Sequence, residues 1–288
     1  ASLGLVYLCG MKVEGVALGT LIAQYAGFLM GIALWMHNYG RLKRLWEIKN
    51  YKLKIKGGEE AGIWEKGAML RFFQVNRDIF LRTLCLVAVT LFFTSAGASQ
   101  GEIILAVNTL LMQLFTLFSY VMDGFAYAGE ALSGRYIGAR NREAFTDTVR
   151  HLFGWGAVMA VLFTLVYALG GNAFLGLLTD DKEVIAVADT YFYWALAVPA
   201  VGIAAFIWDG IFIGATATRG MLLSMAAAAV SFFILYYGLH PVLANHALWL
   251  AFLTYLLMRG VVQTGLSRGV IRQAFSSKKG PAWPKGKQ

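Results

Sequence analysis

Charged residues are scarce in this sequence. Asp, Glu, Lys and Arg together make up 14% of the chain, whereas hydrophobic residues make up 58%. An ordinary soluble domain has about 25% charged and about 45–50% apolar residues, so the composition excludes a soluble core. Cysteine is rare too: Cys9 and Cys85 form no CxxC spacing, and they indicate neither a disulfide framework nor a zinc site. The chain also lacks a Gly-rich P-loop, an HExxH motif and a Ser/His/Asp constellation, so we expect neither an enzyme nor a cofactor.

Long apolar runs dominate the chain instead. About 20 mostly apolar residues are needed to cross the hydrocarbon layer of a bilayer, which is about 30 Å thick. Seven runs meet this length, near residues 15–36, 79–98, 103–128, 152–171, 184–207, 221–239 and 247–266. The sequence therefore predicts an all-α, polytopic transmembrane helical bundle. An eighth run, Ala1 to Leu8, is too short to span, and because the chain opens inside it without a start Met we expect a fragment of a longer protein.

The basic residues alternate with the apolar runs. Of the 25 Lys and Arg residues, ten lie in 37–78, four in 129–150, one at Arg219 and six from Ser267 onward. The intervening gaps are poor in Lys and Arg, and one of them carries Asp180, Asp181 and Glu183. By the positive-inside rule, the basic stretches and the C-terminus face the cytoplasm. Topology thus explains the net charge of +9, and we expect no nucleic-acid partner.

This topology divides the chain into four parts. Residues 1–36 hold a partial helix and one full span, and residues 37–78 form a basic cytoplasmic connection that ends in an amphipathic helix lying on the membrane. An ordinary solvated loop is the alternative for that connection. Residues 79–266 hold six spans, and residues 267–288 form a basic cytoplasmic tail.

One span carries a polar stripe. At 100° per residue, the side chains of Asn108, Ser119, Asp123 and Glu130 fall within an arc of roughly 60°, with Met112 near the same arc. A helix of this kind turns its polar side to a cavity. Because desolvation favours the protonated form of a carboxyl group, the candidate proton carriers are Asp123, Glu130 and Asp209.

Each of these carboxylates also has a structural interpretation. Glu130 could pair with Arg135, and Asp209 with Arg219, as interfacial residues at helix ends. Asp209 begins the triplet Asp-Gly-Ile, which echoes the Asp-Gly-Phe that starts at Asp123. For Arg259, in the last span, we expect a side chain that snorkels to the cytoplasmic surface.

Three motifs resemble a known family. They are FFQVNRDIFLRTL (72–84), NTLLMQLFTLFSYVMDGFAYAGEALSGRYIGARNREAF (108–145) and FIWDGIFIGATATRGM (206–221). Together they resemble the DNA-damage-inducible F (DinF-like) branch of the multidrug and toxic compound extrusion (MATE) family. The resemblance implies twelve helices in two six-helix lobes, of which this chain holds the last helix of the first lobe and the complete second lobe.

The resemblance also implies a function. Such a protein is a multi-pass transporter of the cell inner (plasma) membrane, which we expect to be a monomer that exports cationic or amphiphilic organic compounds in exchange for H⁺ or Na⁺. The implied binding face consists of Asn108, Met112, Ser119 and Asp123, with Gln113 beside it. The family commonly couples transport to an Asp in its first helix, which this chain does not contain.

Two other readings stay open. A flippase or exporter of lipid-linked saccharide belongs to a related class, but it would need several cationic residues in the cavity to hold a phosphate, and only Arg82 and Arg259 lie within spans. The other reading is an inactive fragment or a scaffold that does not transport.

Overall fold

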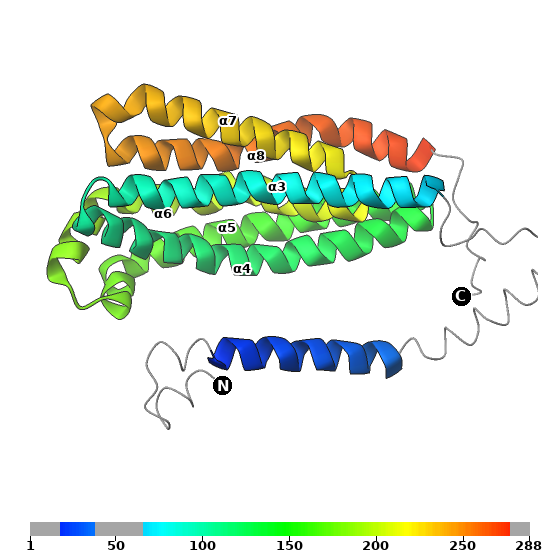
Figure 1. The fold of residues 1–288 in the computed structure, drawn as a ribbon, viewed down its shortest axis with the longest axis horizontal. Helices are drawn as coiled ribbons and strands as arrows, with labels where there is room; N and C mark the ends of the chain where they lie inside the picture. The colour runs from blue at the N-terminus through cyan, green and yellow to red at the C-terminus, as the bar shows by residue number, and fades with distance from the viewer. Residues whose placement is uncertain (1–17, 38–65, 277–288) are drawn as a thin grey trace, which may run out of the picture. The chain divides into compact units, whose positions relative to one another are not determined.

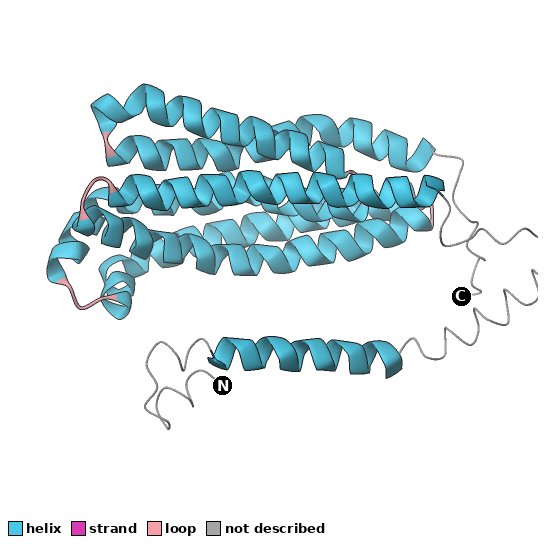
Figure 2. Ribbon diagram, viewed as in Figure 1, coloured by secondary structure: helices cyan, strands magenta, loops and turns pink. Residues whose placement is uncertain are grey.

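The structure is a computed structural model that describes residues 18–37 and 66–276. Every regular element in these two ranges is a helix (Figure 2). Seven of the helices are long and apolar enough to cross a membrane, which confirms the predicted all-α transmembrane bundle and its seven spans. The predicted run at residues 1–8 and most of the predicted connection 37–78 lie outside the described residues.

The chain separates into two compact units, Ala1–Ala68 and Met69–Gln288. The first contains the helix Leu18–His37. The second holds the other six described helices, which pack side by side as a bundle (Figure 1). Its helices are α3 (Lys66–Ala98), α4 (Glu102–Gly138), α5 (Arg142–Leu178), α6 (Lys182–Gly214), α7 (Thr218–Leu243) and α8 (Asn245–Ser276).

Most of these helices are longer than the apolar runs that predicted them. Residues 66–78 continue without a break into the span of α3, so this part of the predicted connection belongs to the same helix as the span. Side-chain caps fix two of the turns. The side chain of Asn141 accepts a hydrogen bond from the backbone N–H of Ala144, and that of Asp181 accepts from Glu183 and Val184. Such caps satisfy N–H groups that have no partner inside the helix.

One proline and one glycine inside the helices differ in their effect on the backbone. The helix α6 continues through Pro199, which is buried. By contrast, α5 changes direction at Gly171, where the backbone leaves helical geometry (φ 11°, ψ −106°). The apolar run 152–171 ends at this same residue, so the membrane-spanning part of α5 stops at the kink.

The helices α4 and α6 form the closest contact in the bundle. A Cβ atom on Gly210 would collide with the backbone carbonyl of Ala126, and one on Gly214 would collide with that of Glu130. Small residues allow membrane helices to approach until their backbones touch. This contact sets the register between α4 and α6.

Burial varies strongly among the helices. In both α6 and α8, 61% of the most apolar window is buried within the protein, whereas the value is 22% for α5 and 17% for α3. The helix α6 packs against α4, α5 and α8, and α8 also packs against α7. Aromatic side chains join α3 to this core: Phe92 contacts Phe232 and Tyr236 of α7, and Phe93 contacts Trp249 of α8. The helices α6 and α8 therefore form the interior of the bundle.

Candidate functional site

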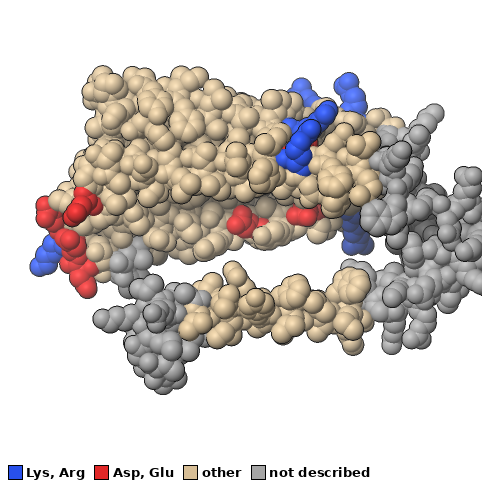
Figure 3. Space-filling model, in the orientation of Figure 1, with Lys and Arg blue, Asp and Glu red and all other residues tan. Residues whose placement is uncertain are grey.

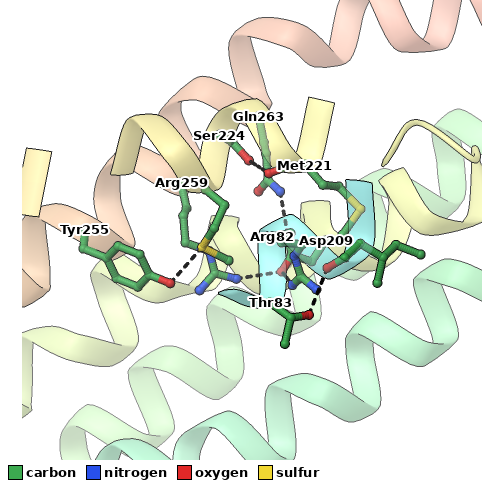
Figure 4. A network of polar contacts seen from close by, with 10 residues as sticks. Arg82, Thr83, Asp209, Met221, Ser224, Tyr255, Arg259 and Gln263 are labelled. Carbon is green, nitrogen blue, oxygen red and sulfur yellow. Dashed lines mark hydrogen bonds and ion pairs between the residues drawn. The ribbon is translucent and has the colours of Figure 1, made fainter. Parts of the chain in front are cut away.

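A buried charge cluster joins three helices of the bundle. It consists of Arg82 from α3, Asp209 from α6, and Arg259 and Gln263 from α8. Figure 4 shows the two guanidinium groups and the Gln263 amide directed at the Asp209 carboxylate. Arg82 and Arg259 both donate to Oδ2, the latter at 2.6 Å, and Gln263 donates to Oδ1 at 2.5 Å.

Both oxygens of the Asp209 carboxylate accept hydrogen bonds in this arrangement. Its side chain is 10% exposed, that of Arg259 is 7% exposed and that of Arg82 is 20% exposed. Charged hydrogen bonds of this kind are stronger than neutral ones, and a buried ion pair needs them to offset the loss of hydration. Asp209 is therefore a structural anion that holds two cations, and proton exchange at this carboxylate would leave both arginines unpaired.

These contacts contradict one alternative and one expectation drawn from the sequence. Asp209 pairs with Arg82 and Arg259, whereas Arg219, its partner in the structural interpretation, is exposed at the start of α7. Arg259 does not snorkel to the surface, since the residue is 6% exposed and its guanidinium lies over the rings of Phe206 and Tyr255. Burial among aromatic rings and pairing with Asp209 hold the arginine inside the bundle.

The cluster has a charge surplus that Asp123 can balance. Two arginines and one aspartate leave one net positive charge, and Asp123 of α4 is near enough to interact electrostatically with all three groups. The close contact between α4 and α6 explains this proximity, because Gly210 follows Asp209 and Ala126 is one helical turn after Asp123. With Asp123 ionised, the four groups together are neutral.

Asp123 differs from Asp209 in its bonding. It is half-buried, and within the described residues its carboxylate receives no hydrogen bond and forms no salt bridge. Glu130 is also half-buried, and the ion pair with Arg135 that its structural interpretation requires does not form. Along the polar stripe of α4, Asp123 and Glu130 thus have carboxylates that no salt bridge holds within the described residues; we call these carboxylates uncommitted.

Exposed aromatic residues flank these carboxylates. Tyr120 is 70% exposed and Tyr127 is 71% exposed. They stand three residues before and four residues after Asp123, which places all three on one helix face, and Glu130 follows Tyr127 by three. We call Tyr120, Asp123, Tyr127 and Glu130 the acidic–aromatic face of α4.

The predicted site residue Asn108 belongs to a different arrangement. It is 2% exposed, its amide nitrogen donates to Asn245 Oδ1 at 2.8 Å, and its Oδ1 accepts from Asn245 and from Trp249 Nε1. Asn108 precedes Asp123 by 15 residues, which separates them by about 22 Å along the helix at 1.5 Å per residue. The structure therefore assigns Asn108 to a buried contact between α4 and α8, away from Asp123.

The remaining predicted residues fall between these two arrangements. Met112 is half-buried and packs against the core, whereas Gln113 is exposed. The Ser119 hydroxyl donates to the Thr116 carbonyl of its own helix at 2.8 Å. Among the described residues, no group of three or more His, Cys, Asp and Glu side chains is placed to hold a metal ion.

Sequence reasoning missed Arg82, Arg259 and Gln263 as members of the cluster. A signal was present, because two arginines and an aspartate inside separate spans are costly to insert and usually pair. The separations of 127 residues between Arg82 and Asp209 and 50 residues between Asp209 and Arg259 hid the pairing.

Comparisons with known proteins agree with this arrangement of helices. The MatE family model matches residues 79–242. The chain is 40% identical over 251 residues to the DNA damage-inducible protein F of Escherichia coli (strain K12), covering 87% of this chain and 52% of that protein. It is 23% identical over 209 residues to Protein DETOXIFICATION 45, chloroplastic, of Arabidopsis thaliana, covering 73% of this chain and 34% of that protein. The chain thus spans about half or less of the length of these curated relatives.

A solved structure shares the fold. It is described as the crystal structure of MATE in the bent conformation, and the comparison gives a TM-score of 0.58 at 17% sequence identity. The match covers 72% of this chain and 45% of that one. At this identity the likeness concerns the fold alone.

Proposed function

Since the chain belongs to the MatE family of membrane transporters, we propose that it is part of a secondary antiporter that exports cationic or amphiphilic organic compounds in exchange for H⁺ or Na⁺. The energy would come from an ion gradient, and alternating access would expose the binding face to each side of the membrane in turn. The acidic–aromatic face of α4 would contribute the binding residues from this chain.

The uncommitted carboxylate of Asp123 is the observation that carries this proposal. A coupling group has to release one ligand before it binds another, which a carboxylate held by two arginines and a glutamine does not do readily. Asp209 is held in this way, and Asp123 is not. Asp123 is therefore the exchangeable carboxylate of our proposal, and Asp209 is the fixed one.

The neighbours of Asp123 suit an organic cation. Aromatic rings attract cations through the negative face of the π system, and the attraction increases when the site is desolvated. Tyr120 and Tyr127 are exposed on either side of the Asp123 carboxylate. A flat or amphiphilic cation could therefore place its charge at Asp123 and its apolar part against a tyrosine ring.

Competition for one carboxylate would couple the two fluxes. A proton or Na⁺ on Asp123 removes its attraction for a cationic substrate, and a bound substrate excludes the ion. Binding of the two ligands would then be mutually unfavourable, and this antagonism is reciprocal by thermodynamic linkage. An inward ion gradient would thereby favour release of the substrate on the outer side.

The orientation in the membrane is part of the same proposal. Figure 3 shows acidic side chains gathered at one end of the bundle, where α5 ends and α6 begins. Those side chains include Asp180, Asp181 and Glu183, whereas Arg142, Arg268 and Arg272 lie where α5 begins and α8 ends. We place the basic end at the cytoplasmic side of the cell inner membrane.

Gradient-driven efflux would test the proposal. Proteoliposomes containing the whole antiporter that we propose, of which this chain is a part, are loaded with a fluorescent organic cation, and export is followed first under a pH gradient and then under a Na⁺ gradient. We expect one gradient to drive export and Asp123→Asn to abolish it. Asp189→Asn is the matched control, because Asp189 is an exposed acidic residue in α6 away from the acidic–aromatic face.

Two results would contradict the proposal. If neither gradient moves an organic cation, the chain is not part of such an antiporter. If Asp123→Asn exports as well as the unaltered protein, Asp123 is not the coupling group. Gradient-independent movement of a lipid-linked saccharide in the same vesicles would favour the flippase alternative.

A further inference from the structure

Three arginines line one pocket at the end of the bundle where α5 begins and α8 ends. The pocket has a volume of about 510 Å³, and its lining consists of Arg142, Arg268, Ile271 and Arg272. We call it the arginine pocket. Among the described residues, no acidic side chain lines the pocket and none of its arginines forms a salt bridge.

A contact between two phenylalanine rings holds together the two helices that line the pocket. Phe145 of α5 is 1% exposed and packs edge-on against Phe275 of α8, with ring centroids 5.5 Å apart. Arg142 precedes Phe145 by one helical turn, and Arg272 precedes Phe275 by one turn, so each arginine shares a helix face with its aromatic anchor. The ring contact therefore keeps Arg142 close to Arg268 and Arg272 despite their like charges.

Like charges held together without a counter-charge favour an anionic ligand. Arginine binds phosphate particularly well, because its planar guanidinium can donate two parallel hydrogen bonds. The start of α5 adds to the attraction, because the first N–H groups of a helix and its dipole favour an anion. The pocket thus has the chemistry of a phosphate site.

The level of the pocket relative to the membrane indicates which kind of phosphate group can reach it. With 32 residues, α8 is about 48 Å long at 1.5 Å per residue, whereas the hydrocarbon layer is about 30 Å thick. The apolar run of α8 ends at residue 266, so the last turns of the helix, which carry Arg268 and Arg272, extend into the layer of lipid headgroups. Basic pockets between membrane helices are known to bind anionic headgroups at this level.

We propose that the arginine pocket binds the phosphate of an anionic phospholipid. The lipid would join the start of α5 to the end of α8, and its phosphate would offset part of the positive charge that the three arginines bring together. This site is separate from the acidic–aromatic face of α4, so the proposal does not depend on which compounds the protein transports.

Native mass spectrometry would test the lipid site. The protein is released from mixed micelles of phosphatidylglycerol and phosphatidylcholine, and the retained lipids are counted. We expect one phosphatidylglycerol to be retained in preference to phosphatidylcholine. A basic residue near an anionic surface contributes about fivefold in affinity, so replacing all three arginines (R142Q/R268Q/R272Q) should weaken retention by on the order of a hundredfold.

Arg219→Gln is the matched control. Arg219 is exposed at the start of α7 and is not part of the pocket lining, so its removal should change retention less than twofold. If the triple variant does not fold, the three single variants replace it, each with about a fivefold loss.

Three outcomes would overturn the proposal. The first is wild-type retention of phosphatidylglycerol by the folded variants. The second is an equal loss in Arg219→Gln, which would indicate only the general surface charge. The third is displacement of the lipid by an equal concentration of inorganic phosphate, which would make the ligand a soluble phosphate.

Discussion

Replacing Gly210 by alanine tests the close contact between α4 and α6. The added Cβ would collide with the backbone carbonyl of Ala126, which cannot rotate away as the end of a flexible side chain could. The two helices must therefore separate. Overpacking a well-packed interior costs about 1–3 kcal/mol, and because the obstacle here is backbone we expect the upper end of this range, about 3 kcal/mol.

The other Asp-Gly pair of the bundle, Asp123-Gly124, provides a matched control. Gly124 follows Asp123 as Gly210 follows Asp209, but a Cβ on Gly124 would meet nothing within 4 Å. Alanine is the better helix former by about 0.5–1 kcal/mol, so Gly124→Ala should leave the protein unchanged or slightly more stable. The same substitution in the same sequence context thus has opposite expected effects.

Thermal unfolding in detergent micelles, followed by tryptophan fluorescence, would measure both variants. A change of 1 kcal/mol moves the midpoint of a large domain by about 2–4 °C, so Gly210→Ala should lower it by roughly 6–12 °C. Gly124→Ala should not lower it. Equal shifts in the two variants would refute the reasoning, because the contact with Ala126 would then have no energetic consequence.

Two further predictions concern the buried polar groups. Asp209→Asn leaves two buried arginines without a full counter-charge, and we expect it to lower the free energy of unfolding by about 3–5 kcal/mol. Arg82→Gln should lower it less than Arg259→Gln, because the Arg82 side chain is more exposed (20% against 7%). Chemical denaturation would rank these variants, and the reverse order for the two arginines would contradict the prediction. Asn108→Ala leaves the amide of Asn245 and the indole N–H of Trp249 unpaired, which should cost about 1–3 kcal/mol per group, whereas Thr109→Ala on the exposed side of α4 should have little effect in the same measurement.

The sequence was sufficient to predict the helices, because the signal for a membrane span is local. Each run of about 20 apolar residues has to form a helix, since the bilayer offers no other partner for its backbone polar groups. The apolar run 152–171 even ended at Gly171, where α5 bends. The division of the chain at residues 37–78 and 267–288 remains a prediction, because large parts of these segments lie outside the described residues.

The partners of the polar residues could not be predicted in the same way. A helical wheel assigns Asn108 and Asp123 to one face, but it does not say which helix covers that face at each level. Near the start of α4, Asn245 and Trp249 of α8 cover it. Around Asp123 the face is only partly covered, and Tyr120 remains exposed.

The charge cluster shows the same limit more clearly. Arg259 fits equally well as a snorkelling residue or as a buried ion-pair partner as long as its neighbours are unknown. Only the packing of α3, α6 and α8 brings Arg82, Asp209 and Arg259 to one level. Long-range contacts between helices are set by three-dimensional packing, which a periodicity along one helix does not contain.

The unequal burial of the helices has a consequence for how the sequence can change. In α5, where 22% of the most apolar window is buried and the mean hydropathy is 2.1, many positions need only an apolar side chain of any shape. In α8, 61% of the window is buried and the mean hydropathy is 1.3, because shape and hydrogen bonding to neighbouring helices replace contact with lipid. Conservative exchanges such as Leu to Ile should therefore accumulate freely in α5. In α8 the tolerated changes would be paired ones, in which a new polar group arises together with its partner on another helix.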